Sequence, residues 1–478
     1  MRNILRKGSR KLIGNPYFCH TEQMCSILKR IDNQNKFDEL RRQFATFTFE
    51  SQERHVERGA LSVRYSFDLD GRYRFRPTLT IPARGFIDWS RLSAREMETL
   101  VFHIGMVELI SYWKIACPRQ VVIRPYSLTK AQTDFWKKLY YNGLGEFLYL
   151  NSIDCAEADL MDIASVSGKP FAKVMSQLEE RVLIPIGGGK DSVVTLELLR
   201  NKLPSRPLIV NPRGATTNCA EIAGFPIDEC LVVNRTLDPT MLQLNKEGYL
   251  NGHTPFSALL AFIGILCGFG SASRYITLSN ESSANESTVI GTNINHQYSK
   301  SVEFEADFRR YVAEFINDKI QYFSFLRPLS ELQIAMLFSR FEAYHPVFRS
   351  CNAGSKTDSW CGSCPKCLFT WLILSPFLSQ EKLIRIFGKN LLLDRDMRPV
   401  FDELSGVSPV KPFECVGTVE EVCACAQSIK DKSETILENA PEILTPVAEL
   451  LQRFDAQHFL PETFVQILKH HLYGRVDY

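Results

Sequence analysis

The most informative segment of the chain reads Val182-Leu183-Ile184-Pro185-Ile186-Gly187-Gly188-Gly189-Lys190-Asp191-Ser192, and it continues into the apolar stretch 193–199. The pattern is typical of a buried strand, a glycine turn and a helix. Glycines let backbone N–H groups close around phosphate oxygens, and a helix N-terminus adds the positive end of its dipole. We therefore expect an anion-binding loop. A tight turn without a ligand is the alternative, but three consecutive glycines give more backbone freedom than such a turn requires.

Two common phosphate loops match this segment poorly. A Walker A loop needs Gly where Ile184 stands and Ser or Thr where Asp191 stands. A dinucleotide fingerprint needs a small residue at the position of Ser192. It also needs an acidic residue at the end of the next strand, where Val210-Asn211-Pro212 stands. The Walker A pattern therefore fails, and the dinucleotide pattern is matched only in part.

The loop resembles instead the PP-loop of the ATP pyrophosphatases, whose pattern Ser-Gly-Gly-x-Asp-Ser is matched by Gly188-Gly189-Lys190-Asp191-Ser192. One position departs, because Gly187 stands where that family usually has Ser. The resemblance implies that the loop holds the β- and γ-phosphates of ATP while a substrate oxygen attacks the α-phosphorus. It assigns Ser192 and the glycine amides to pyrophosphate and Lys190 to charge neutralisation. It leaves Asp191 either a helix-capping role or a place in a Mg²⁺ shell.

The strand pattern divides the chain into four parts. Residues 1–40 are predicted to be a basic leader, and residues 41–170 an α+β module with antiparallel strands and a helix that begins at Ser93. Residues 171–390 contain short apolar strands that alternate with helices, which indicates a parallel sheet covered on both faces. Residues 391–478 are mostly amphipathic helix. The strands predicted for the third part are 182–186, 208–210, 231–233, 275–278 and 322–325.

Taken with the PP-loop resemblance, these patterns predict an α/β fold. Its centre is a parallel-sheet PP-loop domain similar to the adenine nucleotide alpha hydrolases. An N-terminal α+β module and a C-terminal helical region flank this domain.

Composition excludes several classes of partner. The chain has 478 residues and a net charge of only +2, so no electrostatic footprint suggests nucleic acid or an anionic membrane. The basic N-terminus is not followed by the apolar stretch of a signal peptide. The long apolar run Phe256 to Ala272 contains three glycines and lies between strand-like segments, which favours a buried helix over a membrane span. We expect a cytoplasmic protein that binds neither nucleic acid nor membrane. Its oligomeric state stays open, a homo-oligomer included.

Four of the fourteen cysteines are clustered, and we interpret the other ten as small buried side chains. The spacing of the cluster lets the backbone fold a knuckle around one ion, so tetrahedral Zn²⁺ is the natural occupant and an iron–sulfur cluster is the rival. Four protein ligands leave no open coordination position, which predicts a structural role. The four residues are Cys351, Cys361, Cys364 and Cys367.

Two enzyme families share this layout. The PP-loop followed by Pro328-Leu329 and the cysteine cluster is similar to the deazaguanine nitrile synthases of queuosine biosynthesis, which adenylate a carboxylate. A closer resemblance covers about Phe44 to Asp396 and includes the N-terminal module. It looks like the ATP-dependent UDP-N-acetylmuramoyl-L-alanyl-L-glutamate epimerases of peptidoglycan precursor synthesis. The segments that carry it are 102–114, 142–147, 279–286, 295–305 and 360–369.

The epimerase resemblance implies a reaction and its reactants. The terminal L-glutamate of UDP-MurNAc-L-Ala-L-Glu would be inverted to D-glutamate with ATP and Mg²⁺, and AMP and pyrophosphate would be released. Such a reaction fits the loop, because converting the carboxylate into an acyl adenylate removes its charge and makes the Cα proton easier to remove. A base must then take the proton, and an acid must return one on the opposite face.

Six residues are our candidates for this chemistry. Lys190 and Asp191 lie in the loop, and Glu281 follows a predicted strand, so it should lie at the carboxyl edge of the sheet where α/β proteins bind ligands. A solvated loop carboxylate is the alternative for Glu281. The remaining three lie in a polar loop and could transfer protons or bind UDP phosphates, although a lone histidine is more often structural. These three are His296, Tyr298 and Lys300.

Further readings stay open at this point. In the N-terminal module, His103, Glu108 and Lys114 could face the sugar or peptide, but surface and packing roles are favoured. Another carboxylate-adenylating PP-loop enzyme, such as a 7-cyano-7-deazaguanine synthase or an amide ligase, is the first alternative. A tRNA-modifying thiolase would need a reactive cysteine near the loop and a basic surface, and the sequence indicates neither. A zinc-stabilised binding protein that senses nucleotide is the alternative from a different class.

Overall fold

The N-terminal end of the described chain is a helix. The computed structural model describes residues 30–289, 291–430, 432–443 and 445–474, so most of the predicted leader 1–40 lies outside the described residues. The leader prediction is wrong for its last part, because helix α1 (Gln34–Gln43) begins there and buries Phe37 and Leu40. These two apolar residues lie one turn apart in an otherwise polar stretch, which hides the helix in the sequence.

Five parallel strands form the half of the sheet that contains the glycine loop, and all five were predicted. Their order across the sheet is β11-β10-β7-β8-β9. The chain adds strands first on one side of β7 and then on the other, so the winding reverses between β7 and β10. The strands are β7 (Glu179–Pro185), β8 (Ser205–Val210), β9 (Leu231–Thr236), β10 (Ser273–Leu278) and β11 (Gln321–Ser324).

The parallel strands separate two hydrophobic cores, one on each face. On β7, Leu183 belongs to one core, whereas Val182 and Ile184 belong to the other. Tyr275 and Ile276 of β10 divide in the same way. Successive side chains of a strand point to opposite faces, so near-continuous apolar strands fill both cores. The predicted parallel sheet covered on both faces is confirmed.

The long apolar run forms helix α9 (Phe256–Gly270), which lies buried against the sheet. Glycines let it approach β10 closely: a Cβ atom added at Gly264 or Gly268 would lie 2.8 Å from the side chain of Ile276. Within the described residues, a membrane-spanning helix is absent. The prediction of a buried helix is confirmed.

The remaining strands extend the same sheet. Strand β4 pairs antiparallel with β9, with Thr78 opposite Thr236, so both halves form one eleven-stranded sheet. The boundary predicted near residue 170 therefore separates strands of one continuous sheet. The strands are β1 (Thr46–Glu57), β2 (Ala60–Leu69), β3 (Tyr73–Phe75), β4 (Thr78–Ile81), β5 (Gln120–Ile123) and β6 (Asp162–Ser165).

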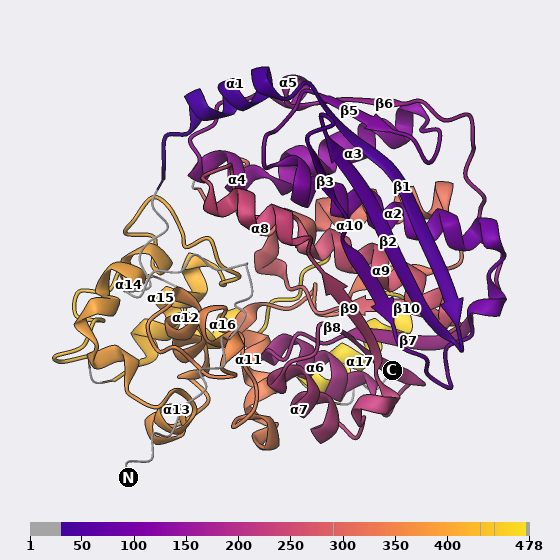
Figure 1. Cartoon of the computed structure of the whole chain (residues 1–478). Coiled ribbons are helices and arrows are strands. Elements are labelled where there is room, and N and C mark those ends of the chain that lie inside the picture. Colours follow the sequence, from indigo (N-terminus) through magenta and orange to yellow (C-terminus); the bar gives the residue numbers. More distant parts are fainter. Residues whose placement is uncertain (1–29, 290, 431, 444, 475–478) are drawn as a thin grey trace, which may run out of the picture.

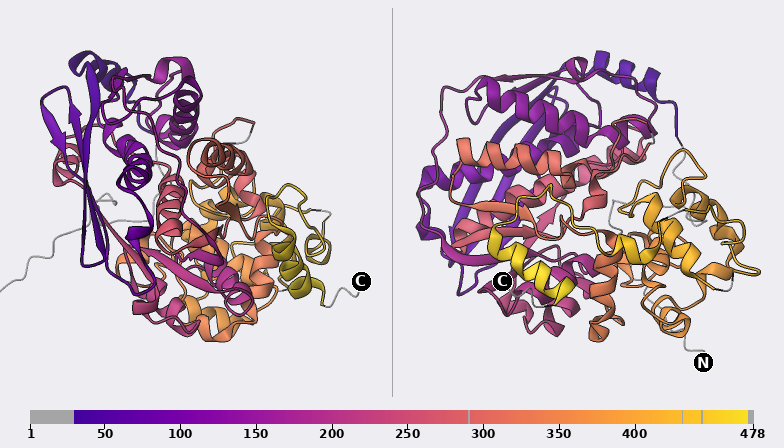
Figure 2. Two further views of the ribbon diagram at one scale, coloured as in Figure 1. Left: turned by 90° about the vertical axis from the view of Figure 1, so that its right-hand side faces the viewer. Right: turned by 180° about the vertical axis from the view of Figure 1, so that it is seen from behind.

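Helices cover one face of this N-terminal half, where β1 and β2 form an outer layer seen edge-on in Figure 2 (left). The capping box predicted for the helix that begins after Ser93 is present: Ser93 caps this helix, and Glu96 bonds back to the Ser93 backbone. The helices of this half are α2 (Ala94–Trp113), α3 (Lys130–Gly143), α4 (Gly145–Leu150) and α5 (Glu157–Leu160).

The other helices pack around the parallel strands or gather beside them. The orange and yellow helices α12–α16 form a group at the left of Figure 1, whereas α17 returns to the sheet. The Phe464 ring of α17 lies 5.1 Å from Tyr275 and 4.8 Å from Phe323. The helices are α6 (Lys190–Leu199), α7 (Gly214–Ile222), α8 (Pro239–Lys246), α10 (Val302–Phe315), α11 (Glu331–Ser339), α12 (Pro365–Leu374), α13 (Gln380–Phe387), α14 (Arg398–Leu404), α15 (Val419–Ser428), α16 (Val447–Leu450) and α17 (Glu462–Tyr473).

The fold class is thus a mixed α/β protein with helices around a large sheet, as predicted at this level. A buried ion pair ties its two halves together. Glu108 of α2 accepts two hydrogen bonds, each of 2.8 Å, from the guanidinium of Arg235 on β9. The side chains are only 3% and 7% exposed, so solvent screens the pair weakly.

We predict that Glu108→Ala lowers the free energy of unfolding by about 3–5 kcal/mol, because it removes the anion that neutralises a buried guanidinium. Urea denaturation followed by circular dichroism measures the change. Glu53→Ala on the exposed side of β1 is the matched control and should change the free energy by no more than about 0.5 kcal/mol. Equal effects of the two substitutions would contradict this role.

Candidate active site

The glycine loop connects the end of β7 to the start of α6. Gly189 is the N-cap of α6, and Gly188 has a φ of +82°, in the left-handed region that favours glycine. The hydroxyl of Ser192 donates to the Gly189 carbonyl at 3.0 Å, and the backbone N–H of Arg349 donates to the Gly188 carbonyl at 2.8 Å. The loop is therefore held by the start of α6 and by the segment that contains Arg349.

Three carboxylates meet beside this loop. One oxygen each of Asp191, Glu281 and Glu331 lie within 4.8 Å of one another. Asp191 is in the first turn of α6, Glu281 follows β10, and Glu331 begins α11. Since β7 and β10 are neighbours across the switch point, their carboxyl ends bring Asp191 and Glu281 together. Glu281 thus lies at the sheet edge where its position in the sequence placed it.

The buried ammonium of Lys190 lies against this cluster and donates to the carboxylates of Asp191 and Glu331. Burial, with Asp191 and Glu281 nearby, raises the pKa of Glu331 to about 8 despite the opposing effect of Lys190. Burial also acts to raise the pKa of Asp191, but Lys190, Lys366 and Lys300 lower it. The cluster therefore favours an added positive charge, and carboxylate oxygens suit Mg²⁺.

One of the two roles expected for Asp191 is wrong, and one member of the cluster was not expected. Asp191 does not cap α6, because the N-cap is Gly189 and the Asp191 carboxylate pairs with Lys190 instead. Glu331 was missed by the sequence analysis. It lies in a different segment from the loop and carries no motif, and only its place after Pro328-Leu329 could have drawn attention to it.

A buried arginine fixes the loops that surround the cluster. Arg327 donates to the backbone carbonyl of Glu281 at 2.6 Å, to the carbonyl of Lys300, and to the Glu305 carboxylate at 3.1 Å. Its side chain is fully buried. One guanidinium thereby joins the end of β10 to the loop that contains Lys300. No sequence pattern marks this arginine.

A second polar group adjoins the carboxylates and centres on Cys415. The Lys300 ammonium lies 2.8 Å from the Cys415 sulfur, and Lys366 donates to the Cys415 carbonyl. His296 pairs through Nδ1 with the carboxylate of Glu146. Cys415 was not singled out in the sequence, because it is distant from the other site residues and carries no motif.

Charge sets the protonation of this second group. Burial acts to lower the pKa of His296, but hydrogen bonds to Cys415 and Glu146 raise it to about 10. Burial acts to raise the pKa of Cys415, but Lys300, His296 and Lys366 lower it to about 6. The pKa of Lys300 is raised, chiefly by Cys415 and Glu281 against the effect of burial. These shifts favour an imidazolium, a thiolate and an ammonium.

The other candidates lie elsewhere. Tyr298 is buried within the hydrophobic core, and burial raises the pKa of its hydroxyl. His103 is fully buried and accepts or donates a hydrogen bond of 3.0 Å with Tyr311. Lys114 donates to a backbone carbonyl, and Glu108 forms the ion pair described above. The surface role favoured for these last three residues is wrong, because all three are buried, and their contacts are those of packing residues.

The four clustered cysteines converge on one point. Their sulfur atoms all lie within 4.8 Å of one another. The distances are 3.6 Å for Cys351–Cys364, 3.7 Å for Cys361–Cys367 and 3.5 Å for Cys364–Cys367. Thiolates around one tetrahedral zinc, each bound at about 2.3 Å, would lie about 3.8 Å apart. The arrangement can therefore hold a single ion.

The cysteine segment also supports the glycine loop directly. Arg349, two residues before the first cysteine, provides the N–H that binds the Gly188 carbonyl. Asp358, between the cysteines, accepts a hydrogen bond of 2.7 Å from the backbone N–H of Ala215 in α7. The loop and the start of α7 are thus anchored to the cysteine cluster.

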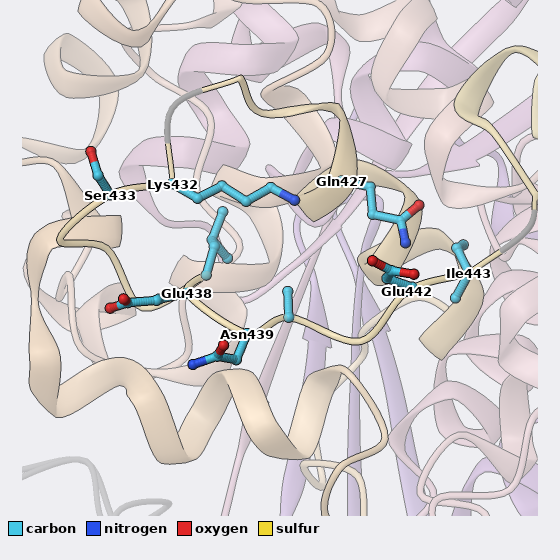
Figure 3. A pocket seen from close by; sticks show the side chains of 9 residues that line it. Gln427, Lys432, Ser433, Glu438, Asn439, Glu442 and Ile443 are labelled. Carbon is cyan, nitrogen blue, oxygen red and sulfur yellow. The ribbon is translucent and has the colours of Figure 1, made fainter.

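A separate depression lies in the C-terminal region and is shown in Figure 3. Its volume is about 590 Å³. None of its lining residues belongs to the glycine loop, the carboxylate cluster or the group around Cys415. They are Gln427, Lys432, Ser433, Leu437, Glu438, Asn439, Ala440, Glu442 and Ile443.

An α/β protein whose switch point gathers a glycine loop, buried carboxylates and lysines has the features of an enzyme rather than of a structural protein. Comparison with known proteins agrees. The model of the MurL N-terminal domain matches residues 38–325, and that of the MurL C-terminal domain matches residues 347–455. The chain belongs to the MurL family. The family resemblance seen in the sequence is confirmed.

Three curated relatives are named UDP-N-acetyl-alpha-D-muramoyl-L-alanyl-L-glutamate epimerase. One from a Micromonospora species is 36% identical over 80% of this chain and 86% of its own length. One from Salinispora tropica is 35% identical over 83% and 87%, respectively. One from Xanthomonas oryzae pv. oryzae is 33% identical over 79% and 84%. No solved structure matches the chain.

We predict that Gly188→Ala displaces the glycine loop and lowers the free energy of unfolding by about 1–3 kcal/mol. An added Cβ would lie 2.9 Å from the backbone of Ala215, at a φ that alanine rarely adopts. Differential scanning calorimetry measures the loss. Gly187→Ser is the control, because a Cβ there has no atom within 4 Å. A stable Gly188→Ala protein would show that this loop conformation does not require glycine.

Proposed function

We propose that this chain converts the terminal L-glutamate of UDP-MurNAc-L-Ala-L-Glu to D-glutamate during peptidoglycan precursor synthesis. The observation that carries the proposal is the name shared by three relatives at 33–36% identity, each matching about four fifths of this chain. The reaction proceeds through an acyl adenylate and releases AMP and pyrophosphate. With this function, the UDP-linked dipeptide is the partner. The chain then acts in the cytoplasm, because ATP and the UDP-linked dipeptide are found there.

The glycine loop supports binding of ATP at this switch point. Its backbone amides and the N-terminus of α6 provide positive potential for the β- and γ-phosphates. The buried Lys190 adds a full charge beside the loop. Asp191, Glu281 and Glu331 would hold Mg²⁺, whose charge would offset their repulsion and neutralise phosphate oxygens.

Adenylation explains why the reaction consumes ATP. A free carboxylate beside Cα carries a charge that opposes carbanion formation, and the acyl adenylate removes that charge. The ammonium groups of Lys300 and Lys366 lie close enough to Asp191 to lower its pKa. They add positive charge beside the phosphate site, which would stabilise a substrate carboxylate and the developing enolate oxygen.

The cysteine cluster supports a structural Zn²⁺. Sulfur separations of 3.5–3.7 Å fit four thiolates around one ion. They fit less well around a [4Fe–4S] cluster, in which each thiolate binds a different iron. Cys351, Cys361, Cys364 and Cys367 would then hold the segment that anchors the Gly188 carbonyl through Arg349.

We predict that purified protein with Mg²⁺, ATP and UDP-MurNAc-L-Ala-L-Glu forms one AMP and one pyrophosphate per glutamate inverted. Asp191→Ala should lower turnover by about 10²-fold or more, because it removes a carboxylate from the Mg²⁺ site and unbalances Lys190. A coupled assay measures the release of pyrophosphate. Chiral analysis of the glutamate, after acid hydrolysis of the product, measures the inversion.

Glu381→Gln, at an exposed position of α13, is the matched control and should retain full turnover. Formation of ADP, or inversion without nucleotide consumption, would sink the adenylate mechanism. No nucleotide use with any carboxylate would favour a nucleotide-sensing protein instead.

We predict one zinc per chain and its loss in Cys364→Ser, because the substitution removes one of four ligands. Plasma mass spectrometry measures the metal content. Cys267→Ser is the control: it also places a hydroxyl at a fully buried cysteine position, but it lies outside the cluster and should keep the metal. Unchanged zinc in Cys364→Ser, or iron in the wild-type protein, would refute the assignment.

A further inference from the structure

Cys415 is placed between two parts of the site. On one side Lys300 lies 2.8 Å from its sulfur, and the same ammonium interacts with Glu281 and Asp191. On the other side His296 hydrogen-bonds the sulfur and pairs with Glu146. The side chain is partly exposed, unlike most of the other cysteines that the structure describes. Only Lys300 therefore separates this sulfur from the carboxylates over which a substrate would bind.

Two neighbours of Cys415, His296 and Lys300, are poor bases. His296 is held as an imidazolium by Glu146, and Lys300 is held as an ammonium, so neither has a free electron pair at neutral pH. Tyr298 is buried in the core with a raised pKa. The charged groups that face the sulfur are Lys300, Lys366, His296 and Glu414; the first three stabilise a thiolate, and Glu414 opposes it.

We propose that the Cys415 thiolate is the base that removes the Cα proton of the activated L-glutamyl residue. This assignment rests on the proposed function, because the step needs the acyl adenylate. Lys300 lies at the sulfur, Lys366 donates to the carbonyl of the same residue, and the His296–Glu146 pair lies beside them. Thiolates act well as general bases when they are ionised near neutral pH.

The step balances as a proton transfer. The Cα–H bond breaks, an S–H bond forms on Cys415, and the electron pair of the C–H bond moves into the enolate of the acyl adenylate. A proton that originates from water is added to the opposite face of Cα. Hydrolysis of the acyl adenylate then releases AMP, and the thiol returns its proton to solvent. His296 and Lys300 are positioning residues that keep the sulfur ionised.

Cys415→Ser separates activation from proton transfer. We expect the variant to keep substrate-dependent exchange of pyrophosphate into ATP, because the phosphate site is untouched. Exchange of the glutamyl Cα proton with deuterated water, followed by mass spectrometry, should fall by about 10²-fold or more. Cys155→Ser is the matched control, a partly exposed cysteine outside the site, and should retain both activities.

The two proposals fail in different ways. A wild-type protein without substrate-dependent pyrophosphate release would overturn the proposed function, and this assignment with it. A wild-type protein that turns over, with a Cys415→Ser variant that exchanges Cα hydrogen at the wild-type rate, would overturn the assignment alone. Loss of pyrophosphate exchange in the variant would also overturn it, since Cys415 would then act in activation rather than in proton transfer.

A measurement on the unaltered chain gives a second test. Iodoacetamide should alkylate Cys415 faster than Cys155 at pH 7, because the pKa of Cys415 is lowered to about 6 whereas burial raises that of Cys155. The rate at Cys415 should fall as the pH drops below about 6, and the UDP-linked dipeptide should protect this residue alone. Peptide mass spectrometry measures both rates. Equal rates, or no protection by the dipeptide, would contradict the assignment.

Discussion

Repulsion among three carboxylates dominates the centre of this molecule. Asp191, Glu281 and Glu331 come from three separate segments, and two of them, Glu281 and Glu331, are buried, where like charges repel strongly. Lys190 neutralises part of that charge, and Arg327 holds the backbone that carries Glu281. Such an arrangement is costly unless a cation arrives with the substrate. The surrounding structure is organised to keep these groups together without one.

Support for the glycine loop comes from segments distant in the sequence. The carbonyl of Gly188 is bound by Arg349, and the start of α7 is bound by Asp358, both from the cysteine-rich segment. The N-terminal strands act on the same region through β9, whose Arg235 pairs with Glu108. The site is therefore shaped by distant parts of the chain, although the backbone amides of the glycine loop come from a few consecutive residues.

Local patterns predicted most of the fold. The alternation of Leu183 with Val182 and Ile184, and the capping box at Ser93, are fixed by neighbouring residues and can be read from the sequence. The pairing of β4 with β9 could not be predicted, because the sequence of a short strand does not indicate which strand it pairs with. The glycine loop and the cysteine cluster are also contiguous motifs, and the resemblance that they carry led to the family.

The less predictable part of the site consists of single residues. Glu331, Arg327 and Cys415 reach the centre only through the tertiary fold, and none belongs to a motif that spacing could reveal. Charge state was equally hidden. His296 and Lys300 were candidates for moving protons, but the carboxylate of Glu146 and the sulfur of Cys415 fix them as cations.

The antiparallel join between β4 and β9 has a practical consequence for anyone who wishes to express the parallel half of the sheet alone. Truncation before β7 would strip β9 of its neighbour and leave a row of backbone donors and acceptors open to solvent. The exposed edge strand of such a fragment would pair with other copies of the fragment. Shortened versions intended for crystallisation should therefore retain the amino-terminal strands or replace them with a blocking residue such as lysine or proline on β9.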